Sequence, residues 1–311
     1  MYLITLFFVV VLHEYGHALT AKKYGIQTKD ILLSPIGGIA RMVKFPEEPI
    51  KEFYIAIAGP MVNLVLAIFT AVLLLICGID LIPTRDPFYL ILTWWGALQM
   101  FLVINVVLFA FNLIPAFPMD GGRVLRALLS TKLGKYKATN VASYIGQSLA
   151  IGFFVFGLLQ QQFVLLFIGI FIFLQAYAER KVIRTEHRMK NTTAKDIVRT
   201  HFSKVNGAVV IDDFIKENQE SQESAFLVVD DQQQAIGVFP KIYLEEIMRQ
   251  QRTHESLNQW IESHIEYIQA DLDIDQIFKL MQTKKLSLVV VHDGEEMIGV
   301  IDRALIKQFA T

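Results

Sequence analysis

The chain has 311 residues, of which 53% are hydrophobic and only 19% are charged, and its mean hydropathy is +0.42. A soluble protein carries about 25% charged residues, so this composition indicates a membrane protein. The formal net charge of −1 excludes the concentrated basic surface of a nucleic-acid-binding protein, and we expect no nucleic acid as a partner. The single cysteine, Cys77, excludes an internal disulfide framework and a Cys-based metal site.

The charges divide the chain into two parts near Arg180. Residues 1–180 carry 13 Lys and Arg against 9 Asp and Glu, whereas residues 181–311 carry 16 against 21. Charged residues therefore make up about 12% of the first part and about 28% of the second. We expect a transmembrane domain at 1–180 and a soluble domain at 191–311.

Five apolar stretches in the first part are long enough to span or nearly span a bilayer, which takes about 20 residues. They cover about 1–24, 53–79, 88–113, 139–159 and 161–178. The segments after the first, third and fifth stretches are rich in Lys and Arg, and only Arg85 lies in a connection on the opposite side. Because positive charge accumulates on the cytoplasmic side, we expect a multi-pass protein of the cell membrane with a cytoplasmic C-terminal domain and Met1 outside. The first stretch lacks the charged start of a signal peptide.

That first stretch contains His13-Glu14-Tyr15-Gly16-His17, which is the HExxH pattern of zinc metalloproteases. Residues four apart lie on one face of a helix, so both imidazoles can reach one metal ion, and Glu14 beside them can accept a proton from water. A chance match is the alternative. Ionisable residues are costly in a membrane helix, so three within five positions indicate a functional site.

A catalytic zinc site needs a third protein ligand, and both histidines of the membrane part already belong to the HExxH pattern. A carboxylate is therefore expected. Asp120 follows Pro115 and Pro118 and precedes a Gly pair, and such irregular backbone at membrane depth is tolerated where it lines a cavity. A helix-ending turn with Asp120 as its cap is the alternative. Most other acidic residues of this part neighbour loop or basic residues and are expected to be solvated; they are Asp30, Glu47, Glu48, Glu52, Asp80, Asp86 and Glu179.

These motifs together resemble the site-2 protease family of intramembrane zinc metalloproteases. The HExxH pattern and the pattern Asn112-x-x-Pro115-x-x-Pro118-x-Asp120-Gly121 carry the resemblance, and two further segments agree with it, Ala58-Gly59-Pro60-x-x-Asn63 and Ser34-Pro35-Ile36-Gly37-Gly38. It covers about residues 1–178. Relatives usually carry another transmembrane segment before the HExxH helix, whereas this sequence opens inside that helix, as expected of a truncated or a shortened member.

The resemblance implies a role for each matching residue. It makes His13, His17 and Asp120 the ligands of one Zn²⁺ per chain and Glu14 the general base. It also places Asn63 and Asn112 near the scissile peptide of a membrane-anchored protein substrate. Residues 30–45 are rich in β-forming residues and turns, which suits a re-entrant β-hairpin whose edge pairs with an unwound substrate; an ordinary cytoplasmic hairpin is the alternative.

The soluble part contains two α/β repeats about 60 residues apart. Strand, turn and strand at 228–239 precede a helix at 243–249, and the same order at 288–301 precedes a helix at 303–309. Further helices are expected at about 212–222 and 273–284. The repeats, at about 203–250 and 264–311, resemble a tandem pair of cystathionine-β-synthase-type (CBS) domains.

CBS pairs often bind adenosine nucleotides through Ser or Thr and Asp a few residues after a strand glycine. Here Gly299 is followed by Asp302 and Leu305, and Gly237 is followed by Pro240 and Tyr243. Both nucleotide sites look degenerate, so we expect a structural or dimerising module that supports a homodimer. Binding of an adenine nucleotide is the alternative.

The sequence thus predicts a multi-pass α-helical membrane protein with a soluble α/β CBS-like pair, acting as a zinc-dependent intramembrane endopeptidase that the CBS-like pair regulates. One alternative is a membrane channel or transporter with a cytoplasmic CBS-type regulator, which needs polar residues along several spans. The other is a non-catalytic metal-binding membrane scaffold, which does not need Glu14.

The orientation in the membrane is testable by cysteine labelling in a Cys77→Ala background. A cysteine near Lys190 should be protected from a membrane-impermeant maleimide in intact cells, whereas a cysteine near Arg85 should react, because positive charge is retained in the cytoplasm. Both positions should react in broken cells, which is the control. Labelling near Lys190 together with protection near Arg85 would place the soluble domain outside.

Overall fold

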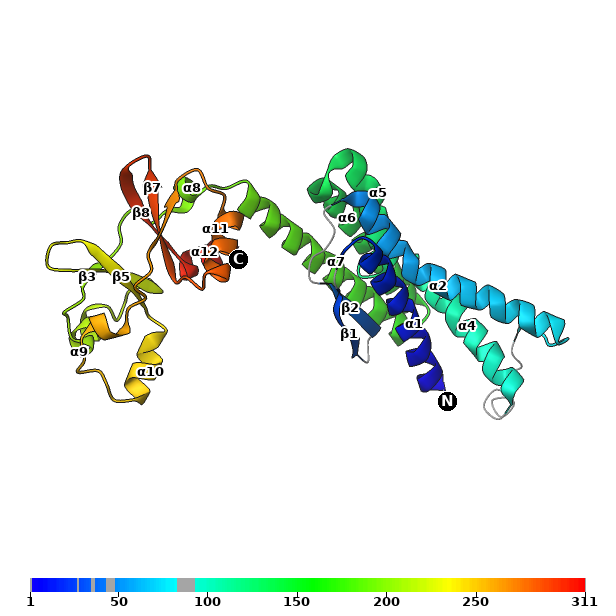
Figure 1. Ribbon diagram of the computed structural model, residues 1–311. Helices are drawn as coiled ribbons and strands as arrows, with labels where there is room; N and C mark the ends of the chain where they lie inside the picture. Colours follow the sequence, from blue (N-terminus) through cyan, green and yellow to red (C-terminus); the bar gives the residue numbers. More distant parts are fainter. Residues whose placement is uncertain (1, 27, 35–36, 43–47, 83–92, 311) are drawn as a thin grey trace. The chain divides into compact units, whose positions relative to one another are not determined.

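The first of two units contains the long apolar helices (Figure 1). The computed structural model describes residues 2–26, 28–34, 37–42, 48–82 and 93–310, and it divides into Met1–Ile183 and Arg184–Thr311. Among the described residues, five helices are long and apolar enough to cross a membrane: α1 (Tyr2–Lys23), α2 (Pro49–Ile76), α4 (Trp94–Asn112), α6 (Lys135–Leu159) and α7 (Phe163–Lys190). They confirm the predicted multi-pass helical membrane protein; residues 88–92 of the predicted third span lie outside the described residues.

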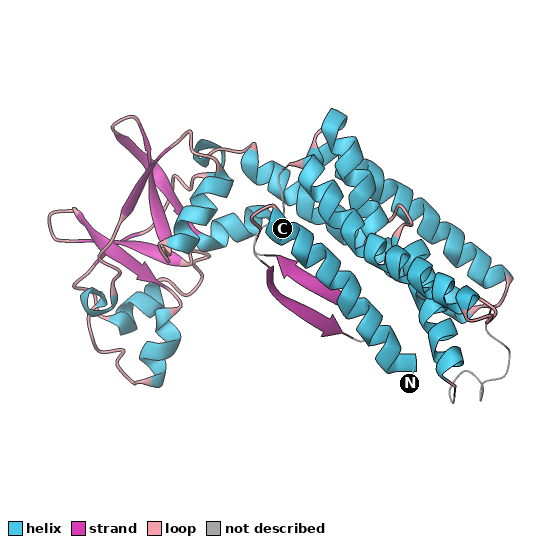
Figure 2. Ribbon diagram, turned by 45° about the vertical axis from the view of Figure 1, so that its right-hand side comes forward, coloured by secondary structure: helices cyan, strands magenta, loops and turns pink. Residues whose placement is uncertain are grey.

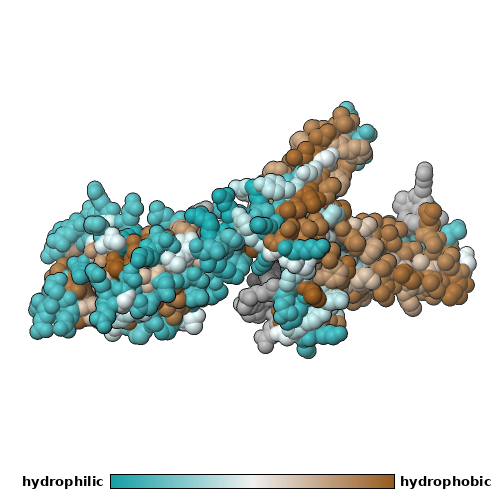
Figure 3. Space-filling view, turned by 90° about the horizontal axis from the view of Figure 1, so that it is seen from above, coloured by the Kyte–Doolittle hydropathy of each residue, from teal (hydrophilic) through white to brown (hydrophobic). Residues whose placement is uncertain are grey.

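These helices expose large apolar side chains along much of their length. Ile76, Leu159 and Phe167 are each more than 70% exposed. Such surfaces are unfavourable in water but suit the hydrocarbon core of a bilayer, where all backbone polar groups are satisfied within the helix. Figure 3 shows apolar residues over the helices of the first unit and a largely hydrophilic surface over the second unit.

Helix α7 is longer than the apolar stretch that predicts it, which ends at 178. It continues through a charged segment to Lys190. Glu186 and Lys190, four residues apart, form an ion pair of 3.0 Å, and basic residues occupy the last turn, where the helix dipole favours positive charge. The segment after the membrane span is therefore helical rather than a loop.

Helix α5 (Asp120–Leu133) lies in a segment that the sequence predicts only as a broken connection. It packs between α2 and α6. A Cβ atom at Gly121 would lie 2.3 Å from the carbonyl oxygen of Ile114, and a Cβ atom at Gly122 would lie 2.7 Å from the backbone nitrogen of Phe117. The two glycines thus allow the preceding loop to fold against the first turn of α5, which begins at Asp120.

The strands β1 (Thr28–Ser34) and β2 (Gly37–Met42) form an antiparallel pair in which Ile31 lies opposite Ala40 (Figure 2). This pair agrees with the predicted hairpin. Its entry into the bilayer stays a prediction, and residues 35–36 and 43–45 of the predicted segment lie outside the described residues.

The second unit contains two repeats of the same order of elements. The first comprises β3 (Lys204–Asn206), α9 (Ile211–Glu217), β4 (Ala225–Val229), β5 (Ala235–Pro240) and α10 (Tyr243–Arg249). The second comprises β6 (Glu266–Gln269), α11 (Ile274–Thr283), β7 (Leu288–Asp293), β8 (Glu296–Asp302) and α12 (Arg303–Ala310). Each repeat has a three-stranded sheet in which the first two strands are parallel and the last two antiparallel. Short helices α8 (Ala194–Ile197) and η1 (Leu257–Trp260) precede the respective repeats.

The central strands of both repeats are buried on both faces. Alternate side chains of a strand point to opposite sides of its sheet, and here each set enters a different apolar core. In β4, Phe226 and Val228 belong to the core of the first repeat, whereas Ala225 and Leu227 belong to a different cluster. That second cluster also contains Leu288, Val290 and Val300 of the other repeat. The two repeats therefore share one apolar core between their sheets.

Candidate active site

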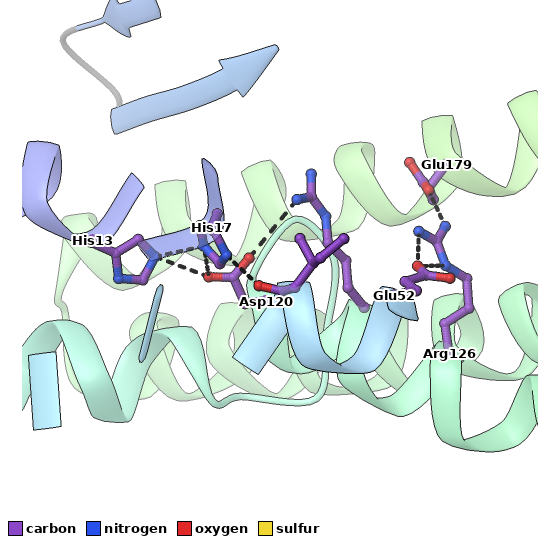
Figure 4. Close-up of polar contacts among 8 residues, drawn as sticks. His13, His17, Glu52, Asp120, Arg126 and Glu179 are labelled. Carbon is purple, nitrogen blue, oxygen red and sulfur yellow. Dashed lines mark hydrogen bonds and ion pairs between the residues drawn. The ribbon is translucent and has the colours of Figure 1, made fainter. Parts of the chain in front are cut away.

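Three buried side chains from two helices meet at one point in the first unit (Figure 4). His13 and His17 lie one turn apart on α1, and Asp120 is the first residue of α5. The Oδ2 atom of Asp120 lies 3.0 Å from Nε2 of His13 and 3.1 Å from Nε2 of His17. The two Nε2 atoms are 3.1 Å apart. The structure therefore brings together the three residues that the sequence predicts as metal ligands.

Helix α2 orients both imidazoles through their other ring nitrogens. Nδ1 of His17 lies 2.7 Å from the carbonyl oxygen of Ile55, and Nδ1 of His13 lies 3.2 Å from Oδ1 of Asn63. A carbonyl oxygen only accepts, so these contacts assign the proton of each neutral ring to Nδ1. The Nε2 lone pairs of both rings then point toward Asp120, as metal-binding histidines require.

This donor set fits a zinc ion. Two neutral Nε2 atoms and a carboxylate oxygen all carry lone pairs, so at about 3 Å from one another they repel unless a metal ion or a proton lies among them. Zinc binds such atoms at roughly 2.0–2.2 Å, which for tetrahedral geometry places the ligand atoms roughly 3.3 Å apart. The observed separations of 3.0–3.1 Å are within a few tenths of an ångström of this value.

Gly59 of α2 forms one wall of the cluster. A Cβ atom at this position would lie 2.3 Å from Nε2 of His17 and 2.7 Å from Nε2 of His13, so no larger residue fits without moving the imidazoles. Gly16 plays a similar part between α1 and α2, because its Cβ atom would lie 2.7 Å from Cγ2 of Val62. The sequence contains the motif at 58–60, but only the structure reveals that its glycine adjoins the histidines.

The other predicted site residues are placed differently. Glu14 is buried on α1 beside His13. Asn63 is fully buried, and within the described part of the chain its Nδ2 atom has no hydrogen-bond partner. Asn112, the last residue of α4, is half-buried, and no hydrogen bond joins it to the histidines or Asp120 among the residues described. The structure thus joins Asn63 to the cluster by a hydrogen bond, and in the described part of the chain it gives Asn112 no such bond.

The expectation that Glu52 is solvated is wrong. Glu52 is 7% exposed, and its Oε1 accepts a hydrogen bond of 2.7 Å from Nε of Arg126 on α5. Arg126 also pairs with Glu179 of α7. Burial by itself would lower the pKa of Arg126, but attraction to Glu52 and Glu179 outweighs burial and raises the pKa above its ordinary value, so the guanidinium stays charged. Glu52 is unavailable as a metal ligand because it is paired elsewhere.

Two histidines and a carboxylate buried among apolar helices, with a glutamate beside the first histidine, define a zinc metalloprotease that acts within the membrane. Residues 1–85 and 88–155 match peptidase family M50, and residues 259–308 match the CBS domain. The chain belongs to peptidase family M50, the family of the site-2 proteases.

Similarity to one relative extends over nearly the whole chain, and similarity to a solved structure extends over about half of it. The chain is 35% identical over 300 residues to "Zinc metalloprotease MJ0392" of Methanocaldococcus jannaschii. The aligned region covers 96% of this chain and 82% of the relative. A solved structure, "Site-2 Protease from Methanocaldococcus jannaschii", is 43% identical, with a TM-score of 0.45, and covers 57% of this chain and 76% of that chain.

Family membership confirms the predicted function. The chain is a zinc-dependent intramembrane metalloprotease with a CBS domain in its C-terminal unit. Membership decides against the channel or transporter and against the non-catalytic scaffold, the two alternatives that the sequence leaves open.

Proposed function

We propose that His13, His17 and Asp120 bind one zinc ion per chain and that Glu14 is the general base of peptide hydrolysis. The observation that carries this proposal is the convergence of two Nε2 lone pairs and a carboxylate oxygen within 3.1 Å beside a buried glutamate. The substrate is a membrane-anchored protein that is cut in or near a transmembrane segment, because the cluster lies among apolar helices with lipid-suited surfaces.

The residues divide the chemistry among them. When bound, zinc supplies a Lewis acid that polarises a carbonyl group and makes water a stronger nucleophile at neutral pH. The carboxylate of Glu14 accepts the proton that the attacking water gives up and transfers it to the leaving amide nitrogen. Oδ1 of Asn63 accepts from Nδ1 of His13 and holds its ring, and a place of Asn63 near the scissile peptide rests on the family resemblance. For Asn112, only the family resemblance supports a place near the scissile peptide.

A peptide bond inside a transmembrane helix must first be freed from its helical hydrogen bonds. We infer that the substrate unwinds locally and pairs with an edge of the sheet formed by β1 and β2. A two-stranded sheet has unpaired backbone groups at both edges, and an extended peptide can add to such an edge as a further strand.

We assign residues 1–180 to the protease domain and residues 191–311 to the CBS-like pair, with its repeats at about 203–250 and 264–311. The change in charge near Arg180 and the two sets of strands support this division. The basic segments support a cytoplasmic location for the CBS-like pair, and regulation of cleavage from that side is part of the proposal.

We infer that the CBS-like pair is a structural or dimerising module rather than a nucleotide site. The position where a hydroxyl residue is expected, at the end of strand β8, holds Asp302, which is 1% exposed. Its carboxylate accepts hydrogen bonds from the backbone N–H groups of Ser224, at 2.7 Å, and Leu305, at 2.9 Å. In the first repeat, the corresponding position holds Pro240, and Tyr243, three residues further on, donates to Glu262 at 3.3 Å. These groups are used within the protein, which leaves fewer of them for a ligand.

The role of Glu14 is tested by Glu14→Gln. Zinc content should equal that of the wild type, because the three ligands remain, while cleavage should fall by a factor of about 10² to 10⁴ because the proton acceptor is lost. Zinc is measured by elemental analysis of detergent-purified protein, and cleavage by mass spectrometry of a single-pass substrate. Glu48→Gln removes the same charge at an exposed position and is the matched control. Undiminished cleavage by Glu14→Gln would remove Glu14 from the mechanism.

The third ligand is tested by two substitutions of Asp120. Asp120→Ala leaves two protein ligands, so zinc should be lost along with activity, whereas Asp120→Asn keeps the shape without the charge and should retain an intermediate amount. Zinc per chain is measured against the wild type and against His17→Ala, which serves as the metal-poor reference. One zinc ion in the wild type is expected. Full zinc occupancy in Asp120→Ala would show that another residue completes the site.

The role of the CBS-like pair is tested by adding ATP to the full-length protein. A ligand that binds only the folded state raises the midpoint of thermal unfolding, so ATP at millimolar concentration should leave the midpoint unchanged. Light scattering should give twice the chain mass of 35.4 kDa after correction for detergent. A clear rise in the midpoint with ATP, or a strictly monomeric mass, would contradict the assignment.

A further inference from the structure

Helix α2 orients the two imidazoles of the candidate zinc site, and helix α5 supplies its carboxylate. The carbonyl oxygen of Ile55 and the side chain of Asn63, both on α2, hold the imidazoles of His17 and His13. Asp120 begins α5. The distance of 3.0–3.1 Å from Asp120 to the two imidazoles therefore depends on how α5 lies along α2.

Arg126 is the charged residue that joins these two helices (Figure 4). It is 5% exposed, and its Nε donates to Oε1 of Glu52, on α2, at 2.7 Å. Its Nη1 donates to Oε1 of Glu179, on α7. The guanidinium carbon also lies 5.1 Å from the centre of the ring of Phe117, in the loop that leads into Asp120. One side chain thus contacts α2, α7 and the loop before the carboxylate ligand.

The spacing along each helix connects these contacts to the site. Glu52 and Ile55 are three residues apart and lie on one face of α2. Asp120 and Arg126 are six residues apart on α5, a rise of about 9 Å. The pair of Arg126 with Glu52 therefore fixes the position of α5 along α2 close to the point where Ile55 holds His17.

We propose that Arg126 is a positioning residue for the zinc site: by pairing with Glu52 and Glu179 it holds Asp120 at the correct distance from His13 and His17. The proposal rests on the proposed function, in which these three residues bind zinc. Arg126 touches neither the metal ligands nor the substrate in this role. Its effect is on the geometry of the donor set, as is common for groups that orient metal ligands from outside the site.

The planar fork of arginine suits this role in a way that lysine does not. Nε and Nη1 reach two different carboxylates, one on α2 and the other on α7. A lysine keeps the positive charge, so the two glutamates are not left without a cation, but a single ammonium group lacks the rigid fork that orients both. Arg126→Lys therefore separates the geometry of the contact from its charge.

The test compares Arg126→Lys with Arg180→Lys in the full-length, zinc-loaded protein. Arg180 lies next to Glu179 on α7 and stacks over the ring of Tyr144 at 4.7 Å, so it matches the substitution without joining α5 to α2. In Arg126→Lys, zinc should pass to a chromogenic chelator about 10 to 100 times faster than in the wild type. The absorption spectrum of the cobalt-substituted protein should change as the donor set is distorted. Arg180→Lys should behave as the wild type in both measurements.

If Arg126 has only a structural role, the result is different. Arg126→Lys should then lower the midpoint of thermal unfolding, while the folded variant releases zinc at the wild-type rate and keeps the wild-type cobalt spectrum. That result would overturn the proposal. If Arg126→Lys does not fold, Glu52→Gln and Glu179→Gln take its place, and wild-type zinc release by both would also overturn it. Zinc binding by the wild type and its loss in His17→Ala are measured first, because their failure overturns the proposed function itself, and the positioning role with it.

Discussion

Electrostatic repulsion among three lone-pair atoms governs the arrangement of the membrane unit. Nε2 of His13, Nε2 of His17 and Oδ2 of Asp120 lie within 3.1 Å of one another, and all three side chains are buried. Such a group costs free energy to assemble unless a metal ion or a proton lies among its members. The packing around these atoms holds α1 and α5 in place against that repulsion.

Helix α2 makes most of the contacts that hold the three side chains in place. It accepts the N–H groups of both imidazoles, it provides the glycine that lets the imidazoles approach, and it pairs with the helix that bears Asp120. Small residues at helix contacts are usual in membranes, where close approach of backbones replaces the hydrophobic effect as a source of stability. Here the same close approach also brings polar backbone atoms of α2 within reach of the histidines.

Much of this organisation could be predicted from the sequence, and the exceptions have physical reasons. Long apolar runs identify the membrane helices, and HExxH fixes His13 and His17 on one helical face, because both signals are local. Elimination among the few acidic residues of the membrane part was sufficient to predict that Asp120 lies close to the two histidines. Glu52 was misread because its partner, Arg126, lies 74 residues away, and a carboxylate among loop residues resembles a solvated one. The length of α5 was missed because prolines and glycines before and at its start suggest a break, although they only shape its first turn.

The separation of the cluster along the chain also has a consequence for biosynthesis. His13 and Asp120 are 107 residues apart. A ribosome adds roughly 5–20 residues per second, so the histidine helix emerges about 5 to 20 s before the carboxylate that joins it. During that interval the growing chain holds only two of the three clustered side chains. The nascent protease is thus assembled in an order that delays completion of its centre until α5 has been made.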